Sequence, residues 1–75
     1  MNLENKIEAV LFWKGEPLSR KRLAEILKVG ELEINEAIGK LKENLAGRGI
    51  VLQEKENEIT LGTAPELSSL IEKLQ

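Results

Sequence analysis

The residues best able to contact a charged partner lie in three short segments. One segment is basic, Arg20-Lys21-Arg22, and two are acidic, Glu31-Leu32-Glu33-Ile34-Asn35-Glu36 and Glu54-Lys55-Glu56-Asn57-Glu58. Three neighbouring cations can contact phosphate or an acidic protein surface weakly, whereas closely spaced carboxylates repel phosphate. An ordinary solvated surface is the other interpretation of the basic segment, and it is the one that we favour. What these segments can do therefore depends on the elements that position them.

No grouping of residues typical of an enzyme, a cofactor site or a metal site is present. The sequence contains no histidine and no cysteine, which removes the usual zinc ligands and the usual nucleophile pairs. It also lacks a glycine-rich phosphate loop. Thirteen carboxylates ensure that some lie near each other, but none falls among apolar residues that would tune it for acid–base chemistry. We therefore expect no catalytic residue, no cofactor and no metal.

Length and charge narrow the class of protein further. The 75 residues are enough for one small domain, whose extra stabilisation would come from packing or from a second copy. A nucleic-acid-binding module normally has a basic excess, but the net charge here is −2. No apolar run reaches the roughly 20 residues needed to span a bilayer, and no signal-peptide pattern is present. The expected location is the cytoplasm, without membrane attachment.

Apolar spacing predicts three helices in the first part of the chain. The first covers about residues 3–13, and Pro17 follows it as a helix breaker. The second begins at the N-cap Ser19 and reaches about Lys28. The third covers about residues 31–46, with an apolar stripe at helical spacing made by Ile34, Ala37, Ile38, Leu41 and Leu45. The short turn at residues 28–30 contains glycine, as a helix-turn-helix requires.

The spacing changes from helical to alternating after Gly49. Apolar residues flank Glu56-Asn57 on both sides and predict a hairpin whose apolar face covers the helices: Ile50, Leu52, Ile59 and Leu61. Pro65 then opens a last helix. Its apolar residues are expected to face inward: Leu67, Leu70, Ile71 and Leu74. Three helices, a two-stranded wing and a C-terminal helix predict an α+β winged helix-turn-helix domain.

The charges of this predicted fold argue against reading DNA. A DNA-binding helix-turn-helix inserts the start of its second motif helix into the major groove. Here that start carries Glu31, Glu33 and Glu36, and the tip of the wing carries three acids against one base. Sequence-specific DNA binding by this domain alone is therefore not expected. A DNA-binding transcription regulator stays as the alternative function, on the strength of the fold and the basic segment.

Two surfaces are candidates for a protein partner. On the third helix, Leu32 lies away from the core stripe, on the side that also holds Glu36, Gly39 and Glu43. It either faces a partner or tucks onto the preceding turn. On the first helix, Ala9, Phe12 and Trp13 fall outside the main stripe, and large aromatic residues often anchor interfaces. The opposite interpretation folds the rings into the core under Pro17. We favour that interpretation for Phe12 and leave Trp13 open.

Several stretches of the chain resemble the segregation and condensation protein B (ScpB) family. The most specific is Gly15-Glu16-Pro17-Leu18-Ser19, placed just after Ile7-Glu8-Ala9-Val10-Leu11-Phe12. Further matches are Leu23-Ala24-Glu25-Ile26-Leu27, Gly47-Arg48-Gly49-Ile50, and residues 63–74 with Pro65-Glu66 and Glu72-Lys73-Leu74. The resemblance covers nearly the whole chain.

This resemblance implies a non-catalytic accessory subunit of the SMC–kleisin complex, which condenses and segregates prokaryotic chromosomes, at the nucleoid. It implies a homodimer built through N-terminal domains, and the kleisin ScpA as a partner that leads to SMC. Family members usually have a second winged-helix domain, which is absent from this chain. We therefore expect the N-terminal domain, as part of a longer protein or as a naturally short one. Gly30 also stands where the family commonly has an acidic helix cap.

Overall fold

Helix α1 (Leu3–Lys14) opens the fold in the computed structural model, which describes residues 1–75. The Asn2 side chain caps its start by accepting a hydrogen bond from the Asn5 backbone N–H at 2.9 Å. Gly15, with a φ of 65°, ends the helix and donates its N–H to the Leu11 carbonyl at 3.1 Å. Ile7 and Leu11 are buried where α1 packs against the third helix.

Helices α2 (Arg20–Leu27) and α3 (Glu31–Leu45) form the predicted helix-turn-helix. Ser19 caps α2 by accepting the Arg22 N–H at 3.0 Å, as predicted. Lys28 ends α2 in the left-handed conformation, with a φ of 58°. Gly30 has no side chain with which to cap α3, but the Glu33 carboxylate accepts the Gly30 N–H at 3.2 Å. All five residues of the predicted stripe on α3 are buried.

The sheet has three strands, one more than the predicted two-stranded wing. Strands β2 (Ile50–Lys55) and β3 (Glu58–Thr63) form the predicted hairpin around Glu56-Asn57, and Glu56 has a positive φ of 58°. The added strand is β1 (Leu18–Ser19), which pairs antiparallel with β3 and gives the order β1-β3-β2. Pro17 keeps the chain out of a helix, so the two residues after it can pair with the exposed edge of β3.

One apolar core joins the first three helices to the sheet. It contains twelve buried residues: Ile7, Leu11, Leu18, Leu23, Ala24, Ile34, Ala37, Ile38, Leu41, Leu45, Leu52 and Ile59. No polar or charged residue is buried. The predicted apolar face of the hairpin is only partly in this core, because Ile50 is half exposed and Leu61 is partly buried.

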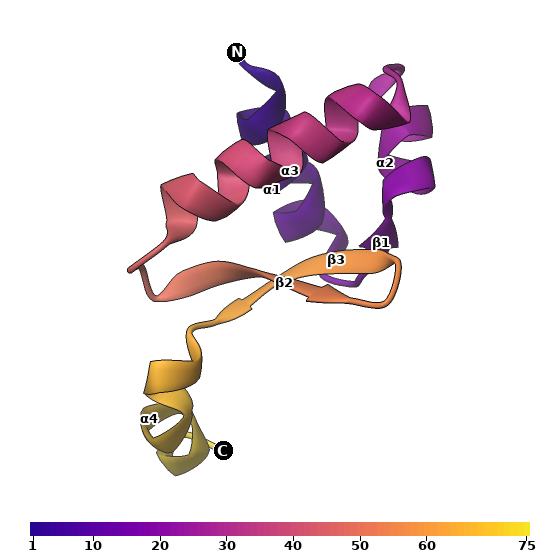
Figure 1. Ribbon diagram of the computed structural model, residues 1–75. Helices are drawn as coiled ribbons and strands as arrows, with labels where there is room; N and C mark the ends of the chain where they lie inside the picture. The colour runs from indigo at the N-terminus through magenta and orange to yellow at the C-terminus, as the bar shows by residue number, and fades with distance from the viewer.

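The prediction that the last helix packs inward is wrong. The 3-10 turn η1 (Pro65–Leu67) leads into α4 (Ser68–Lys73), and neither contains a buried residue. Leu70 and Leu74 are 51% and 75% exposed. Figure 1 shows α4 extending away from the sheet on the side opposite the other helices. The chain turns off at Ala64, whose N–H donates to the Gly49 carbonyl at 2.8 Å, and Pro65 fixes the backbone that follows.

This projecting helix makes the molecule elongated. Its extents are 40 × 22 × 20 Å and its radius of gyration is 12.8 Å, against about 11 Å for a compact domain of this length. The apolar stripe correctly predicts that a helix forms after Pro65. It cannot specify which surface the stripe faces, because that depends on the path of the chain after β3. No helix of the structure is long and apolar enough to cross a membrane.

Candidate protein-interaction surfaces

The basic segment at the start of α2 is tied to the acidic wing. Arg20 donates from Nη2 to the Glu54 Oε2 at 3.0 Å, and Lys42 Nζ of α3 lies 3.6 Å from Glu54 Oε1. The Arg20 hydrogen bond, aided by the charge of Lys42, lowers the pKa of the Glu54 carboxyl below its ordinary value, against a smaller opposing effect of burial. Glu54 also places a negative charge near the start of α2, which offsets the unfavourable position of three cations there.

This ion pair engages Arg20, one of the three residues considered for a weak contact with phosphate or an acidic partner. Arg22 is engaged as well, although more weakly, with Nη1 3.5 Å from Glu25 Oε1 on the exposed surface. Among the three, Lys21 alone forms no ion pair within the chain. The sequence could not reveal the pairing of Arg20, because it joins residues 34 positions apart through the tertiary fold. The segment is therefore a largely neutralised surface, not a concentrated positive patch.

The outer face of α3 is open. Leu32 is 78% exposed, so it faces outward and does not tuck onto the preceding turn. Glu36, Gly39 and Glu43 are exposed on the same helix, as their spacing predicts. The position that contacts DNA bases in other helix-turn-helix proteins thus presents one leucine among carboxylates. This face suits a partner with apolar and basic groups better than it suits phosphate.

The aromatic pair on α1 is also exposed, which corrects the expectation for Phe12. Phe12 and Trp13 are 80% and 85% exposed, and neither folds into the core under Pro17. The reason is that α1 continues to Lys14, so both residues keep helical geometry and lie at large angles from the Ile7–Leu11 stripe. Ala9 is exposed as well. Two uncovered rings on so small a domain make this face a candidate surface for association.

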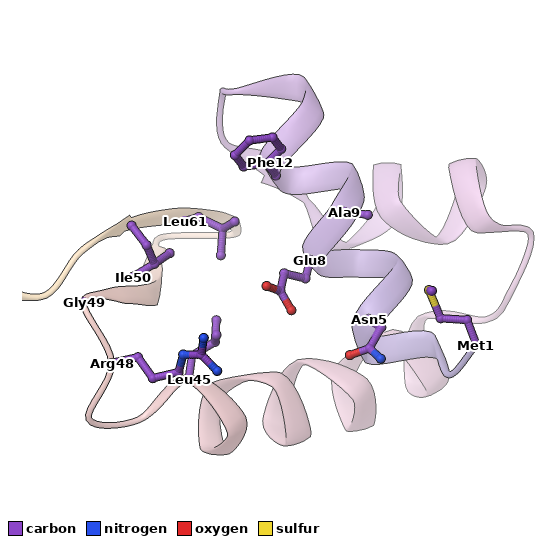
Figure 2. Close-up of a pocket in the computed structure, with 10 residues that line it drawn as sticks. All are labelled: Met1, Asn5, Glu8, Ala9, Phe12, Leu45, Arg48, Gly49, Ile50 and Leu61. Carbon is purple, nitrogen blue, oxygen red and sulfur yellow. The ribbon is translucent and has the colours of Figure 1, made fainter.

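A groove lies beside α1, between that helix, the end of α3 and the hairpin. It encloses about 600 Å³, and its apolar lining comes from Met1, Ala9, Phe12, Leu45, Ile50 and Leu61. Glu8 and Arg48 add one charge of each sign and extend into the same space (Figure 2). Neither forms an ion pair within the chain. Sequence reasoning found Ala9 and Phe12, but it missed the other side of the groove.

Nothing in the sequence distinguishes these missed groove residues from residues of the core. Leu45, Ile50 and Leu61 have the spacing of core residues, and only the packed structure shows that two of them are not fully covered. Trp13 and Leu32, by contrast, lie outside the groove. The structure therefore brings Ala9 and Phe12 together in one site and places the outer face of α3 elsewhere. No group of carboxylates is arranged to hold a metal ion.

Comparison with known proteins identifies the family. Residues 5–75 match the family described as segregation and condensation complex subunit ScpB. The chain belongs to the ScpB family. Among curated relatives, the segregation and condensation protein B of Carboxydothermus hydrogenoformans is 41% identical over 76 residues, which cover 99% of this chain and 41% of that protein. The corresponding protein of Clostridium tetani is 39% identical over 70 residues, 91% of this chain and 37% of its own length.

A solved ScpB structure shows the same fold. It is the crystal structure of a dimer of the ScpB N-terminal domain complexed with an ScpA peptide. The likeness has a TM-score of 0.86 and 33% sequence identity, and it covers 96% of this chain and 93% of that one. The chain spans about two fifths of the length of the curated ScpB relatives it matches. The predicted winged-helix fold and the ScpB resemblance are both confirmed.

Proposed function

We propose that this chain acts as a non-catalytic accessory subunit of the SMC–ScpA–ScpB complex, in chromosome condensation and segregation at the nucleoid. Within that role the domain forms a homodimer and contacts ScpA, and through ScpA it is connected to SMC. The observation that carries the proposal is the solved relative, a dimer of an ScpB N-terminal domain with an ScpA peptide, which the chain matches over 96% of its length. That coverage also supports correspondence to the N-terminal winged-helix domain.

The surface chemistry fits a protein that binds other proteins. Phe12, Trp13, Leu32, Leu70 and Leu74 are all at least half exposed, whereas the core holds only small and medium aliphatic side chains. Burying such groups against a partner removes apolar area from water at roughly 25 cal/mol per Å². Both aromatic residues of the chain are thus available for interfaces and contribute little to the core.

Two partners can be contacted at once because the candidate surfaces are far apart. The groove lies at the end of α3 that contains Leu45, and Leu32 lies at the other end of the same helix. The rise of 1.5 Å per residue places these two positions about 20 Å apart along the axis. We assign the surface with Ala9, Phe12 and Trp13 to the second copy. The α3 face with Leu32, Glu36, Gly39 and Glu43 is the candidate for another partner.

The alternative, a DNA-binding transcription regulator, has less support. Arg20 is paired with Glu54, the exposed start of α3 is acidic, and the wing tip adds further carboxylates. The comparisons found ScpB proteins and give no support to a regulator. DNA binding by this domain alone would have to overcome like-charge repulsion at both elements that normally contact the duplex.

The decisive experiment combines the chain with ScpA of the same organism. Isothermal titration calorimetry should show saturable binding of ScpA, and the complex should then be retained by SMC. Titration into duplex DNA at low and moderate salt is the matched control, and we expect no binding in the micromolar range. The proposal is overturned if ScpA fails to bind, or if micromolar DNA binding weakens steeply with salt as phosphate contacts require.

A further inference from the structure

We propose that the outer edge of β2 is a docking site for an extended segment of a partner protein, which binds there as an additional antiparallel strand. The inference depends neither on the dimer nor on the contact with ScpA, so it goes beyond the proposed function. Its starting point is the strand order β1-β3-β2, which leaves one long side of β2 without a neighbouring strand.

The backbone of β2 turns three residues toward this free side. The Ala64 N–H donates to the Gly49 carbonyl at 2.8 Å, which extends the hydrogen-bonded ladder between β2 and β3. Because antiparallel ladders alternate, the residues bonded to β3 are Gly49 and every second residue after it. The N–H and C=O groups of Ile50, Leu52 and Glu54 therefore point to the outer edge. No turn, cap or side-chain hydrogen bond uses these backbone groups.

The first part of this edge lacks the features that keep natural edge strands from pairing. Such strands carry proline, a bulge or charged side chains. The register with β3 is unbroken from Ile50 to Lys55, so β2 has no bulge. Its first four residues, Ile50-Val51-Leu52-Gln53, include no charge and no proline, and two of them are β-branched. A row of backbone donors and acceptors at strand spacing selects another extended backbone as its partner.

The two ends of the edge carry opposite charges. Arg48 precedes β2, whereas Glu56 and Glu58 lie at the wing tip, beyond the other end of the strand. None of these three residues forms an ion pair within the chain. Lys55 offsets only one of the two carboxylates, and Glu8, which shares the groove with Arg48, comes from α1 and not from the sheet. The edge is therefore positive at its start and negative at the wing.

These features define the chemistry of the partner segment. Both strand pairs of the sheet are antiparallel, and antiparallel pairing is slightly more stable per residue than parallel pairing. A segment that runs antiparallel to β2 starts near the wing and ends near Arg48. It should therefore carry basic residues at its N-terminal end and acidic residues at its C-terminal end. Between them, uncharged β-forming residues lie opposite Ile50-Val51-Leu52-Gln53.

NMR titration of the ¹⁵N-labelled chain with synthetic peptides tests this site. The probe is an acetylated and amidated peptide with two lysines, three Val-Thr pairs and two aspartates, in that order. Its matched control has the same composition and the opposite order of charges. The probe should bind at least threefold more tightly than the control, because exposed ion pairs contribute up to about 1 kcal/mol. The amide signals of Ile50, Leu52 and Glu54 should shift, and their exchange with solvent should become slower.

A change in the backbone tests the strand pairing itself. A synthetic chain that is N-methylated at Leu52 loses one donor of the outer edge but keeps its ladder with β3. It should bind the probe at least tenfold more weakly than the unmodified chain. N-methylation at Leu3 is the control, because the first N–H of a helix has no acceptor within the helix, and it should leave binding unchanged. Far-UV circular dichroism checks that both chains are folded.

A change in charge tests the direction of the bound segment. Glu56→Lys reverses a charge at the wing end of the edge, so it should remove most of the preference for the probe over the control peptide. Glu16→Lys makes the same change in charge at an exposed residue outside the sheet and should preserve that preference.

Several outcomes would overturn this inference without touching the proposed function. One is the absence of binding by either peptide at millimolar concentration. Others are equal affinities for the two orders of charge, or shifts that spare the amides of β2. Amides of Ile50, Leu52 and Glu54 that are already protected from exchange in the chain alone would show that a second copy covers the edge, which also contradicts the proposal. Binding of ScpA is measured separately, and its failure alone overturns the proposed function.

Discussion

The guanidinium of Arg20 lies 3.0 Å from the carboxylate of Glu54 and joins the start of α2 to the wing. Glu54 also faces Lys42 of α3 at 3.6 Å, so one carboxylate connects three elements that are distant in the sequence. The pairing with Glu54 reduces the positive charge that Arg20 offers at the start of α2.

The ion pair makes part of the stability dependent on pH. The folded-state pKa of Glu54 lies below its ordinary value of 4.5, so its contribution is fully present above that value and is lost as the pH falls through the lowered pKa. Glu54→Gln should therefore destabilise the fold at pH 7 by about 0.2–1 kcal/mol, the range of exposed pairs. The difference from wild type should shrink below pH 4.5, as measured by urea unfolding at several pH values.

Glu16→Gln is the control for this titration, because Glu16 is exposed and belongs to no ion pair. It should change the free energy of unfolding little at either pH. A loss in Glu54→Gln that is equally large in acid would contradict the assignment of the effect to the charge of Glu54.

The end of α2 offers a stabilising substitution. Lys28 has a φ of 58°, in the left-handed region that costs a side chain about 1 kcal/mol and costs glycine nothing. Lys28→Gly should raise the free energy of unfolding by about 1 kcal/mol, and the melting temperature by roughly 4–8 °C. Lys40→Gly, in the exposed middle of α3, should lower it by about as much. Thermal melts that shift both variants downward would refute this account of Lys28.

The sequence predicts the parts of the fold whose signals are local. Ser19 as a cap, the stripe of α3 and the hairpin around Glu56-Asn57 each depend on residues a few positions apart, and all three are confirmed. The family resemblance is confirmed as well. The strand β1 is missed because two residues carry no alternation. It exists only because β3 has a free edge within reach of Leu18.

The candidate site is predicted less completely, for a physical reason. An apolar position indicates that a side chain avoids water, but it does not tell whether its partner is the core or another molecule. The sequence favours a core position for both Phe12 and Leu70 on this basis, and both are exposed. The groove is lined by residues from two parts of the chain, 1–12 and 45–61, which are more than 30 positions apart in the sequence. These two parts form one groove only when α1 and the hairpin are packed together.

Buried and exposed leucines on one helix should respond differently to truncation. Leu41 is fully buried in the core, and Leu32 on the same α3 is 78% exposed. Leu41→Ala should cost about 2–5 kcal/mol, since it removes buried methyl groups and leaves a cavity. Leu32→Ala should stay within about 0.5 kcal/mol of wild type. Denaturant unfolding measures both, and comparable losses would show that Leu32 is packed against the fold after all.

Trp13 provides an intrinsic probe of the exposed face of α1. It is the only tryptophan of the chain and is 85% exposed, so the monomer should emit as a solvated indole and be quenched readily by acrylamide. It lies next to Phe12 but outside the groove, and an approaching copy would remove part of its water. Emission should then shift to shorter wavelength, with less quenching, as the concentration is raised through the dimer transition. Phe12→Glu supplies the control, because a chain that does not associate should keep its solvated spectrum at every concentration. An indole shielded from acrylamide in the dilute monomer would instead place Trp13 inside the domain and contradict the exposed face.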